Sequence, residues 1–140
     1  MGNSRDALPE PAEGMQPEDT FSEPGGNDQK TEELSKRQTI NNLAAIGDSA
    51  SVMAMAEYTR DADKEIRKLS VNGISSVQSD ESTQILGQVL QDEPDHEIRN
   101  IVLRALGQRP NDIAARALLE GALNDADTEV KSLADQLLNQ

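Results

Sequence analysis

The chain has 140 residues and carries 26 aspartates and glutamates against 13 lysines and arginines, so its formal net charge is −13. It has one histidine and no cysteine, which excludes disulfides, thiolate metal ligands and cysteine nucleophiles. The acid excess argues against a nucleic-acid partner or an anionic lipid surface, because both need locally dense cations. The apolar runs are too short for membrane insertion, and the length suits one domain with a tail.

The segment 1–30 differs in composition from the rest of the chain. It holds four of the six prolines and four of the nine glycines, and its acidic residues outnumber the basic ones by seven to two. Its apolar residues are few and scattered, with Phe21 as the one aromatic. Such a segment buries too little apolar surface to offset the conformational entropy that folding removes. We predict a disordered, acidic tail over residues 1–30 and a folded domain over residues 31–140.

The start of the chain admits a second interpretation. Asp6 takes the place where an N-myristoylation signal needs serine or threonine, and no signal-peptide pattern is present. A Gly-Asn-Ser start before an acidic, proline-rich spacer is also typical of bacterial lipoproteins just after their lipidated cysteine, whose place Met1 takes here. A lipid-tethered periplasmic protein therefore stays open as a hypothesis beside a protein of the bacterial cytoplasm.

A sequence repeat follows the tail. The segment Asp63-Lys64-Glu65-Ile66-Arg67 recurs from Asp95 to Arg99 and, at the same spacing, from Asp127 to Lys131. The apolar residues that follow stay in register: Leu69, Ile101 and Leu133, and then Ile74, Leu106 and Leu138. Three copies at one fixed spacing indicate a repeat architecture.

Each copy opens an amphipathic helix. Its first carboxylate suits an N-cap, so Asp63, Asp95 and Asp127 are the expected helix caps, and the next glutamate lies in the first turn, where the helix dipole favours negative charge. Apolar residues then recur at helical spacing, and a second apolar helix lies between successive copies. A degenerate earlier copy begins near Ile40. We predict no strands and seven helices, at residues 31–46, 49–59, 63–75, 80–91, 95–107, 111–123 and 127–139.

These motifs resemble a known repeat family. The Asp-x-Glu-[Ile/Val]-[Arg/Lys] start, the Ala105-Leu106-Gly107 helix end and the leucine-rich second helix are similar to short HEAT repeats, most closely those of phycobilisome lyase-like proteins. The resemblance covers residues 35–140 and is strongest from Asp92 to Leu138. It implies an all-α fold, a right-handed α–α superhelix of about 3.5 repeats. The markers of tetratricopeptide and ankyrin repeats are missing.

The resemblance also implies a structural ladder between repeats. In this family the basic residue after the Ile or Val lies between neighbouring repeats and pairs with an aspartate there. The expected cations are Arg67, Arg99 and Lys131, and the candidate partners are Asp61, Asp92 and Asp125. We expect each pair to contribute about 0–1 kcal/mol to stability.

No residue pattern indicates catalysis. His96 occupies a first-turn position that Lys64 and Thr128 take in the other copies, which favours a solvated residue over a metal ligand or general base. The acids from Asp92 to Asp95 could hold a hard cation, but similar acids recur as caps in every copy. We therefore expect no catalytic residue, no metal and no cofactor.

Two surfaces are candidates for binding. In HEAT stacks the second helices line the concave side, so the resemblance leaves a binding groove and an ordinary solvated face as alternatives there. The candidate face consists of Gln84, Gln88, Gln91, Arg116 and Glu120. The last helix has no following partner, so we also expect Ala134 and its neighbours to stay half bare, which would allow self-association through this helix.

These observations favour a non-catalytic protein–protein interaction module or scaffold whose partner is another protein. The alternatives are an accessory lyase-like or chaperone-like factor that acts on a modified protein, and the lipid-tethered structural protein of a bacterial envelope.

Overall fold

The computed structural model describes the chain from Gly26 to Gln140, with side chains from Lys30 onward. The chain divides into two units, residues 1–36 and residues 37–140. The described part of the first unit is the opening of helix α1 (Gly26–Ile46). The predictions made for residues 1–25, including Phe21 and the lipoprotein-like start, lie outside the described residues.

Helix α1 begins at Gly26, earlier than the predicted start at residue 31. Residues 26–30, Gly-Asn-Asp-Gln-Lys, were assigned to the tail by composition, but they contain no proline and continue directly into the predicted helix. Because they carry no apolar residue, a helix over them leaves no amphipathic pattern in the sequence.

The second unit consists of helices joined by short turns. After α1 come α2 (Ser49–Ala56), the 3₁₀ helix η1 (Glu57–Arg60), α3 (Lys64–Ser75), α4 (Asp80–Asp92), α5 (His96–Gly107), α6 (Ile113–Ala122) and α7 (Thr128–Leu138). None of the described residues is in a strand. The predicted helix over 49–59 changes to 3₁₀ geometry at Glu57, and within this turn the Thr59 hydroxyl donates to the Ala56 carbonyl at 2.6 Å.

Aspartate side chains begin most of these helices. Asp63, Asp95 and Asp127 lie at the N-caps of α3, α5 and α7, and each accepts the backbone N–H two residues on at 2.8–2.9 Å. Asp48 and Asp112 cap α2 and α6 in a similar way, although the repeat pattern did not single them out. Each cap satisfies N–H groups that have no partner within the first turn of a helix.

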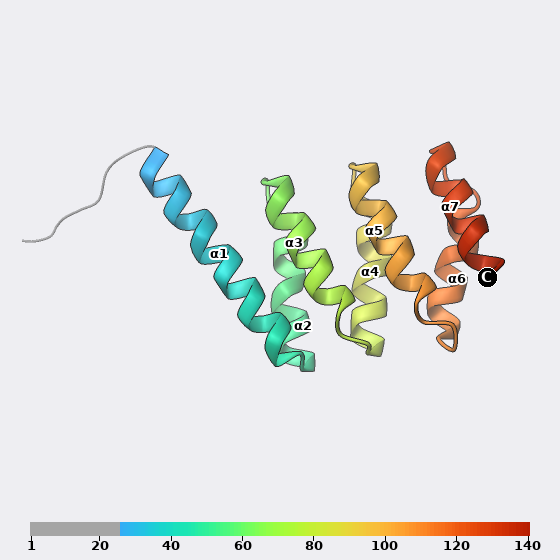
Figure 1. The fold of residues 1–140 in the computed structure, drawn as a ribbon, viewed down its shortest axis with the longest axis horizontal. Coiled ribbons are helices and arrows are strands. Elements are labelled where there is room, and N and C mark those ends of the chain that lie inside the picture. The colour runs from blue at the N-terminus through green and yellow to red at the C-terminus, as the bar shows by residue number, and fades with distance from the viewer. Residues whose placement is uncertain (1–25) are drawn as a thin grey trace, which may run out of the picture. The chain divides into compact units, whose positions relative to one another are not determined.

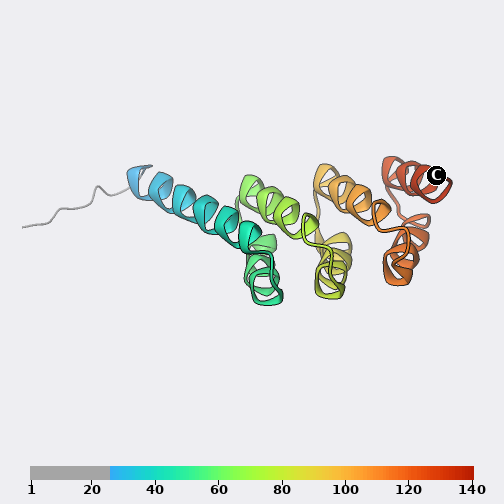
Figure 2. The ribbon, with the colours of Figure 1, turned by 60° about the horizontal axis from the view of Figure 1, so that its bottom comes forward.

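The helices of residues 37–140 form two layers. Helices α3, α5 and α7 lie side by side in one layer, and α2, α4 and α6 lie side by side in the other (Figures 1 and 2). Contacts between neighbours within each layer, and between the layers, join every pair to the next. The largest fully buried side chains lie between them: Ile40, Val52, Met55, Ile66, Val71, Ile74, Leu86, Ile98, Val102, Leu103, Leu106 and Val130. Each pair of helices thus buries its apolar side against the next pair.

The last helix corrects one prediction. Ala134, which we expected to be half bare, is fully buried, and Leu133 beside it is buried as well, because α7 packs against both α5 and α6. The residues that α7 leaves exposed include Lys131, Ser132 and Asp135, all polar. The expectation for Ala134 is therefore wrong, whereas Leu137 and Leu138 of the same helix are only partly buried, and self-association through this helix stays a prediction.

Candidate functional site

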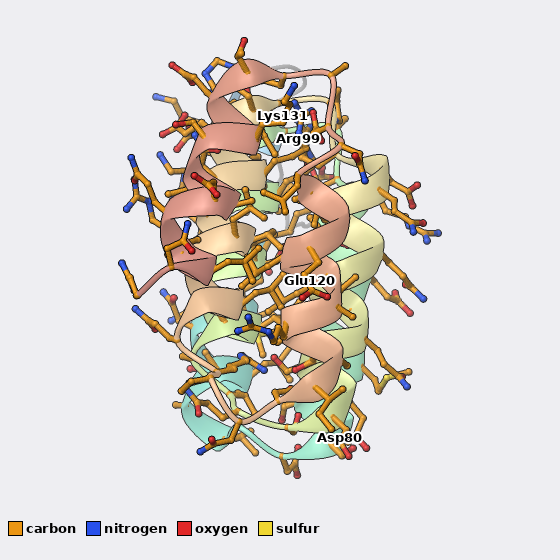
Figure 3. All side chains as sticks on the ribbon, turned by 90° about the vertical axis from the view of Figure 1, so that its right-hand side faces the viewer. Asp80, Arg99, Glu120 and Lys131 are labelled. Carbon is orange, nitrogen blue, oxygen red and sulfur yellow. The ribbon has the colours of Figure 1, made fainter. Side chains whose placement is uncertain are left out.

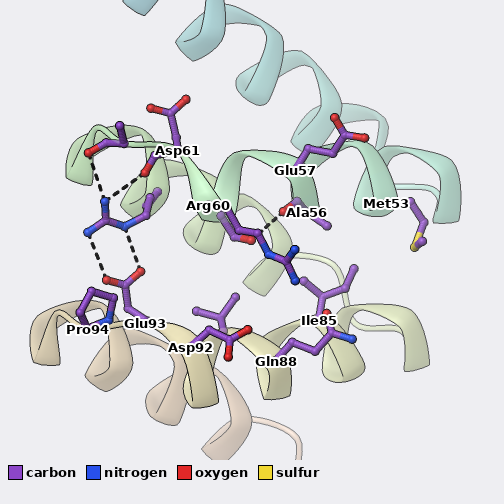
Figure 4. Close-up of a pocket in the computed structure, with 14 residues that line it drawn as sticks. Met53, Ala56, Glu57, Arg60, Asp61, Ile85, Gln88, Asp92, Glu93 and Pro94 are labelled. Carbon is purple, nitrogen blue, oxygen red and sulfur yellow. Dashed lines mark hydrogen bonds and ion pairs between the residues drawn. The ribbon is translucent and has the colours of Figure 1, made fainter.

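The guanidinium of Arg67 joins two successive repeats. It donates to both carboxylate oxygens of Glu93, at 3.0 and 3.2 Å, and to the backbone carbonyls of Asp61 and Ala62, at 3.0 and 3.3 Å (Figure 4). The side chain of Glu93 is only 2 % exposed, and it also accepts the Asp95 N–H at 3.0 Å. The planar fork of the guanidinium allows this two-bond pairing with a carboxylate.

The carbonyl contacts recur one repeat later, but the carboxylate partner lies two positions further along. Arg99 donates to the backbone carbonyls of Glu93 and Pro94, at 3.0 and 3.3 Å, and to the carboxylate of Asp127 at 3.2 Å. The third expected cation, Lys131, is exposed. It lies at the same end of the helices as Arg99, and Asp80 lies at the other end (Figure 3).

The acidic partners in the structure lie one or two residues after the predicted ones: Glu93 replaces Asp92, and Asp127 replaces Asp125. Arg67 pairs with Glu93 while Asp92 is exposed, because Asp92 ends helix α4 and Glu93 begins the turn that faces the arginine. The carboxylates of Asp61 and Asp125 accept the N–H groups two residues on, at 2.9 and 2.7 Å, and so hold the turns themselves.

Substitution of Glu93 by alanine is expected to lower the free energy of unfolding by about 1–3 kcal/mol, because it leaves the half-buried Arg67 guanidinium without its carboxylate. Asp92→Ala, one residue away and exposed, is the matched control and is expected to change stability by less than about 0.5 kcal/mol. Urea unfolding of both variants measures the difference. Equal losses would contradict the pairing of Arg67 with Glu93.

Two lysines of α3 pair with acidic side chains at the start of α5. Lys64 pairs with Asp95 and Glu97, at 3.1 and 2.9 Å, and Lys68 pairs with Glu97 at 2.8 Å. Hydrogen bonds from Lys68 and then Lys64 hold the pKa of Glu97 below its usual value. His96 is exposed, and its Nε2 lies 3.6 Å from Glu129 on α7. No group of three or more metal-ligating side chains occurs in the described part of the chain.

A buried arginine that the repeat pattern missed links the second and third repeats. Arg109, in the turn between α5 and α6, is only 5 % exposed. Its guanidinium donates to the backbone carbonyls of Ser75, Val77 and Ser79, at 3.0–3.5 Å, and to the hydroxyls of Ser82 and Thr83, at 3.0 and 2.9 Å. Burial lowers the pKa of Arg109 from its ordinary value.

The hydroxyl of Thr83 extends this network to a carboxylate. It donates to Asp112 at 2.7 Å, and this bond is the main reason why the pKa of Asp112 lies below its usual value. Asp112 is also the cap of α6, so the same carboxylate holds the helix start and the network around Arg109.

Thr83→Val is expected to raise the pKa of Asp112, whereas Thr83→Ser keeps the hydroxyl and serves as the control. Since the folded-state pKa of Asp112 is depressed, its stabilising contribution is present above the unfolded-state value, about pH 4, and is lost as the pH falls through the folded-state value. The stability difference between the wild type and Thr83→Val should therefore shrink on acidification. Carboxyl NMR titration and urea unfolding at two pH values test this, and a constant difference would contradict it.

The residues of the candidate binding face lie as the sequence placed them, on α4 and α6. All five are exposed: Gln84, Gln88, Gln91, Arg116 and Glu120. Arg116 lies 3.6 Å from Glu120 in the same helix. The three glutamines make no side-chain hydrogen bond within the described residues, so their donors and acceptors face solvent.

A groove of about 630 Å³ lies beside this face, between the α2–η1 segment and α4 (Figure 4). Its apolar lining includes Met53, Ala56, Ile85, Val89 and Pro94. Its polar lining includes Glu57, Arg60, Gln88 and Asp92, and the Arg67–Glu93 pair belongs to the same lining. Sequence reasoning found Gln88 but missed the groove, because its other wall comes from a helix one repeat earlier.

Helix pairs that bury their apolar sides against the next pair define an α-solenoid. The family model for HEAT repeats matches residues 28–107 and 57–139, so this chain belongs to the HEAT-repeat family. The predicted family and the predicted helical-repeat fold are both confirmed. No curated protein matches the chain.

Membership of this family carries general consequences. HEAT repeats typically mediate protein interactions, and the family is generally non-enzymatic. No helix between Gly26 and Gln140 combines the length and apolar character needed to cross a membrane.

Proposed function

We propose that this chain is a non-catalytic module that binds another protein through the exposed face of its second helices. The observation that carries this proposal is a contrast between α3 and α4. Lys64 and Lys68 on α3 are paired with Glu97 of the next repeat. On α4, Gln84, Gln88 and Gln91 are exposed without a hydrogen-bond partner among the described residues.

Free polar groups beside a groove suit recognition of another protein. Side chains that are already paired must give up a partner before they bind anything else, whereas free amides can donate and accept without that cost. The rigid stack holds the face in one shape, so binding needs little reordering of the module. Neither feature requires a reacting group or a cofactor.

Site-specific photocrosslinking tests the proposal. A benzophenone amino acid replaces Gln88 on the candidate face or, as the matched control, Asn72, which is exposed on α3 in the other layer. In extracts of the source organism we expect a discrete adduct from the Gln88 position that excess unlabelled protein competes away, and none from the Asn72 position. Adducts from Asn72 alone, or adducts that the unlabelled protein does not compete, would contradict the choice of face.

A further inference from the structure

An exposed methionine forms part of one wall of the groove. Met53 on α2 is 58 % exposed, although it is large and apolar. Ile85 and Val89, both buried on α4, line the same hollow. A partner side chain seated here would cover Met53, and the flexible thioether can adapt to its shape. The groove therefore has room and apolar surface for one large apolar side chain.

The charges around this apolar surface are predominantly negative. The lining contains Glu57, Asp61, Asp92 and Glu93 against Arg60 and Arg67. Arg67 and Glu93 neutralise each other, and of the remaining side chains Glu57 and Asp92 stand against Arg60. The side chains of Glu57 and Asp92 come from opposite walls, and neither forms a hydrogen bond or an ion pair among the described residues (Figure 4). A cation that enters the groove finds free carboxylates on both sides.

We propose that this groove binds an extended segment of a partner protein in which a large apolar side chain is flanked by lysine or arginine. The apolar side chain packs against Met53 and Ile85, and the flanking cations lie next to Glu57 and Asp92. This inference rests on the proposed function and specifies the partner chemistry within it. The net charge of −13 attracts a basic segment to the whole molecule before it reaches the groove.

The probe is the blocked peptide Gly-Ser-Lys-Leu-Leu-Lys-Ser-Gly, titrated into the full-length, isotope-labelled chain and followed by NMR. We expect saturable shifts at Met53, Gln88 and Asp92, with a dissociation constant of about 1 mM, since a short flexible peptide loses conformational entropy on binding. A peptide with both lysines replaced by glutamate, and another with both leucines replaced by serine, should bind much more weakly.

Charge variants should act in opposite directions. Asp92→Asn removes a free carboxylate and should weaken binding about three- to fivefold, whereas Arg60→Gln removes the opposing cation and should tighten it by a similar factor. General damage to the fold would weaken binding in both variants. The apolar contact is tested by Met53→Ser, which should weaken binding, against Ile46→Ser, whose side chain is 63 % exposed outside the groove lining.

The possible results separate this inference from the proposed function. Saturable shifts centred on Arg116 and Glu120 would overturn the groove and leave binding by the second-helix face intact. The absence of saturable shifts, or equal binding of the glutamate peptide, would overturn the groove chemistry, while the crosslinking experiment decides the proposed function independently.

Discussion

Truncation of Leu106 to alanine is expected to lower the free energy of unfolding by about 2–5 kcal/mol, the largest single effect that we predict. Leu106 lies on α5 and is only 1 % exposed within the core. The substitution removes apolar contacts and leaves a cavity between neighbouring pairs of helices. Each pair buries its apolar side only against its neighbours, so these contacts are not replaced. Urea unfolding followed by circular dichroism measures the loss.

Ile113→Ala is the matched control, because it also shortens a large aliphatic side chain but at a position that is 86 % exposed at the start of α6. Its effect should lie within about 0.5 kcal/mol of zero, since almost no buried surface is lost. A loss at Ile113 as large as that at Leu106 would contradict the assignment of the core.

Replacement of Arg109 by methionine is expected to destabilise the protein by about 2–4 kcal/mol, because the backbone carbonyls of the α3–α4 turn then lose their donors. Methionine keeps much of the side-chain volume, so the loss reports mainly on hydrogen bonds. Arg104→Met on the exposed side of α5 is the control and should be nearly neutral.

The conservative variant sharpens this test. Arg109→Lys keeps the charge but cannot offer five donors in a planar fork, so it should restore only part of the stability. Full restoration by lysine would show that charge alone matters, and an unchanged stability of Arg109→Met would contradict the role of the network.

The fixed spacing of the repeat allowed much of the fold to be predicted. Once Asp63, Asp95 and Asp127 marked the starts of α3, α5 and α7, the apolar register determined which side of each helix is buried. The change to 3₁₀ geometry at Glu57 could not be predicted, because the segment after Ala56 contains neither glycine nor proline to signal it. The early start of α1 could not be predicted either, because residues 26–30 carry no apolar residue that would show helical spacing.

The contacts between repeats were harder to predict than the helices. The cations Arg67 and Arg99 were identified, but a turn with several adjacent acids does not reveal which carboxylate faces inward, and the structure selects Glu93 and Asp127. Arg109 was overlooked because a search for repeated residues finds only what recurs, and the equivalent position one repeat earlier is Val77. A cation at an otherwise apolar position of a repeat is the signal that could have found it.

Only one wall of the candidate site could be predicted from the sequence. The exposed glutamines of α4 follow from helical spacing, so Gln84, Gln88 and Gln91 could be named in advance. The opposite wall of the groove, with Met53 and Glu57, belongs to the degenerate first repeat, where the pattern is weakest. Its distance from α4 depends on how neighbouring helices of one layer pack, which no local pattern encodes.

The contacts that Arg67 and Arg99 make between repeats also bear on how repeats could be added to such a chain. Each arginine donates to two carbonyls in the turn just before its own helix and to a carboxylate in the turn one unit later, so the carbonyl contacts of the two arginines are equivalent. A tandem duplication of residues 63–94 would place the new Arg67 against the carbonyls of Glu93 and Pro94, as Arg99 is placed now. A duplicated unit would therefore keep the same arginine–carbonyl contacts where it meets the unit before it.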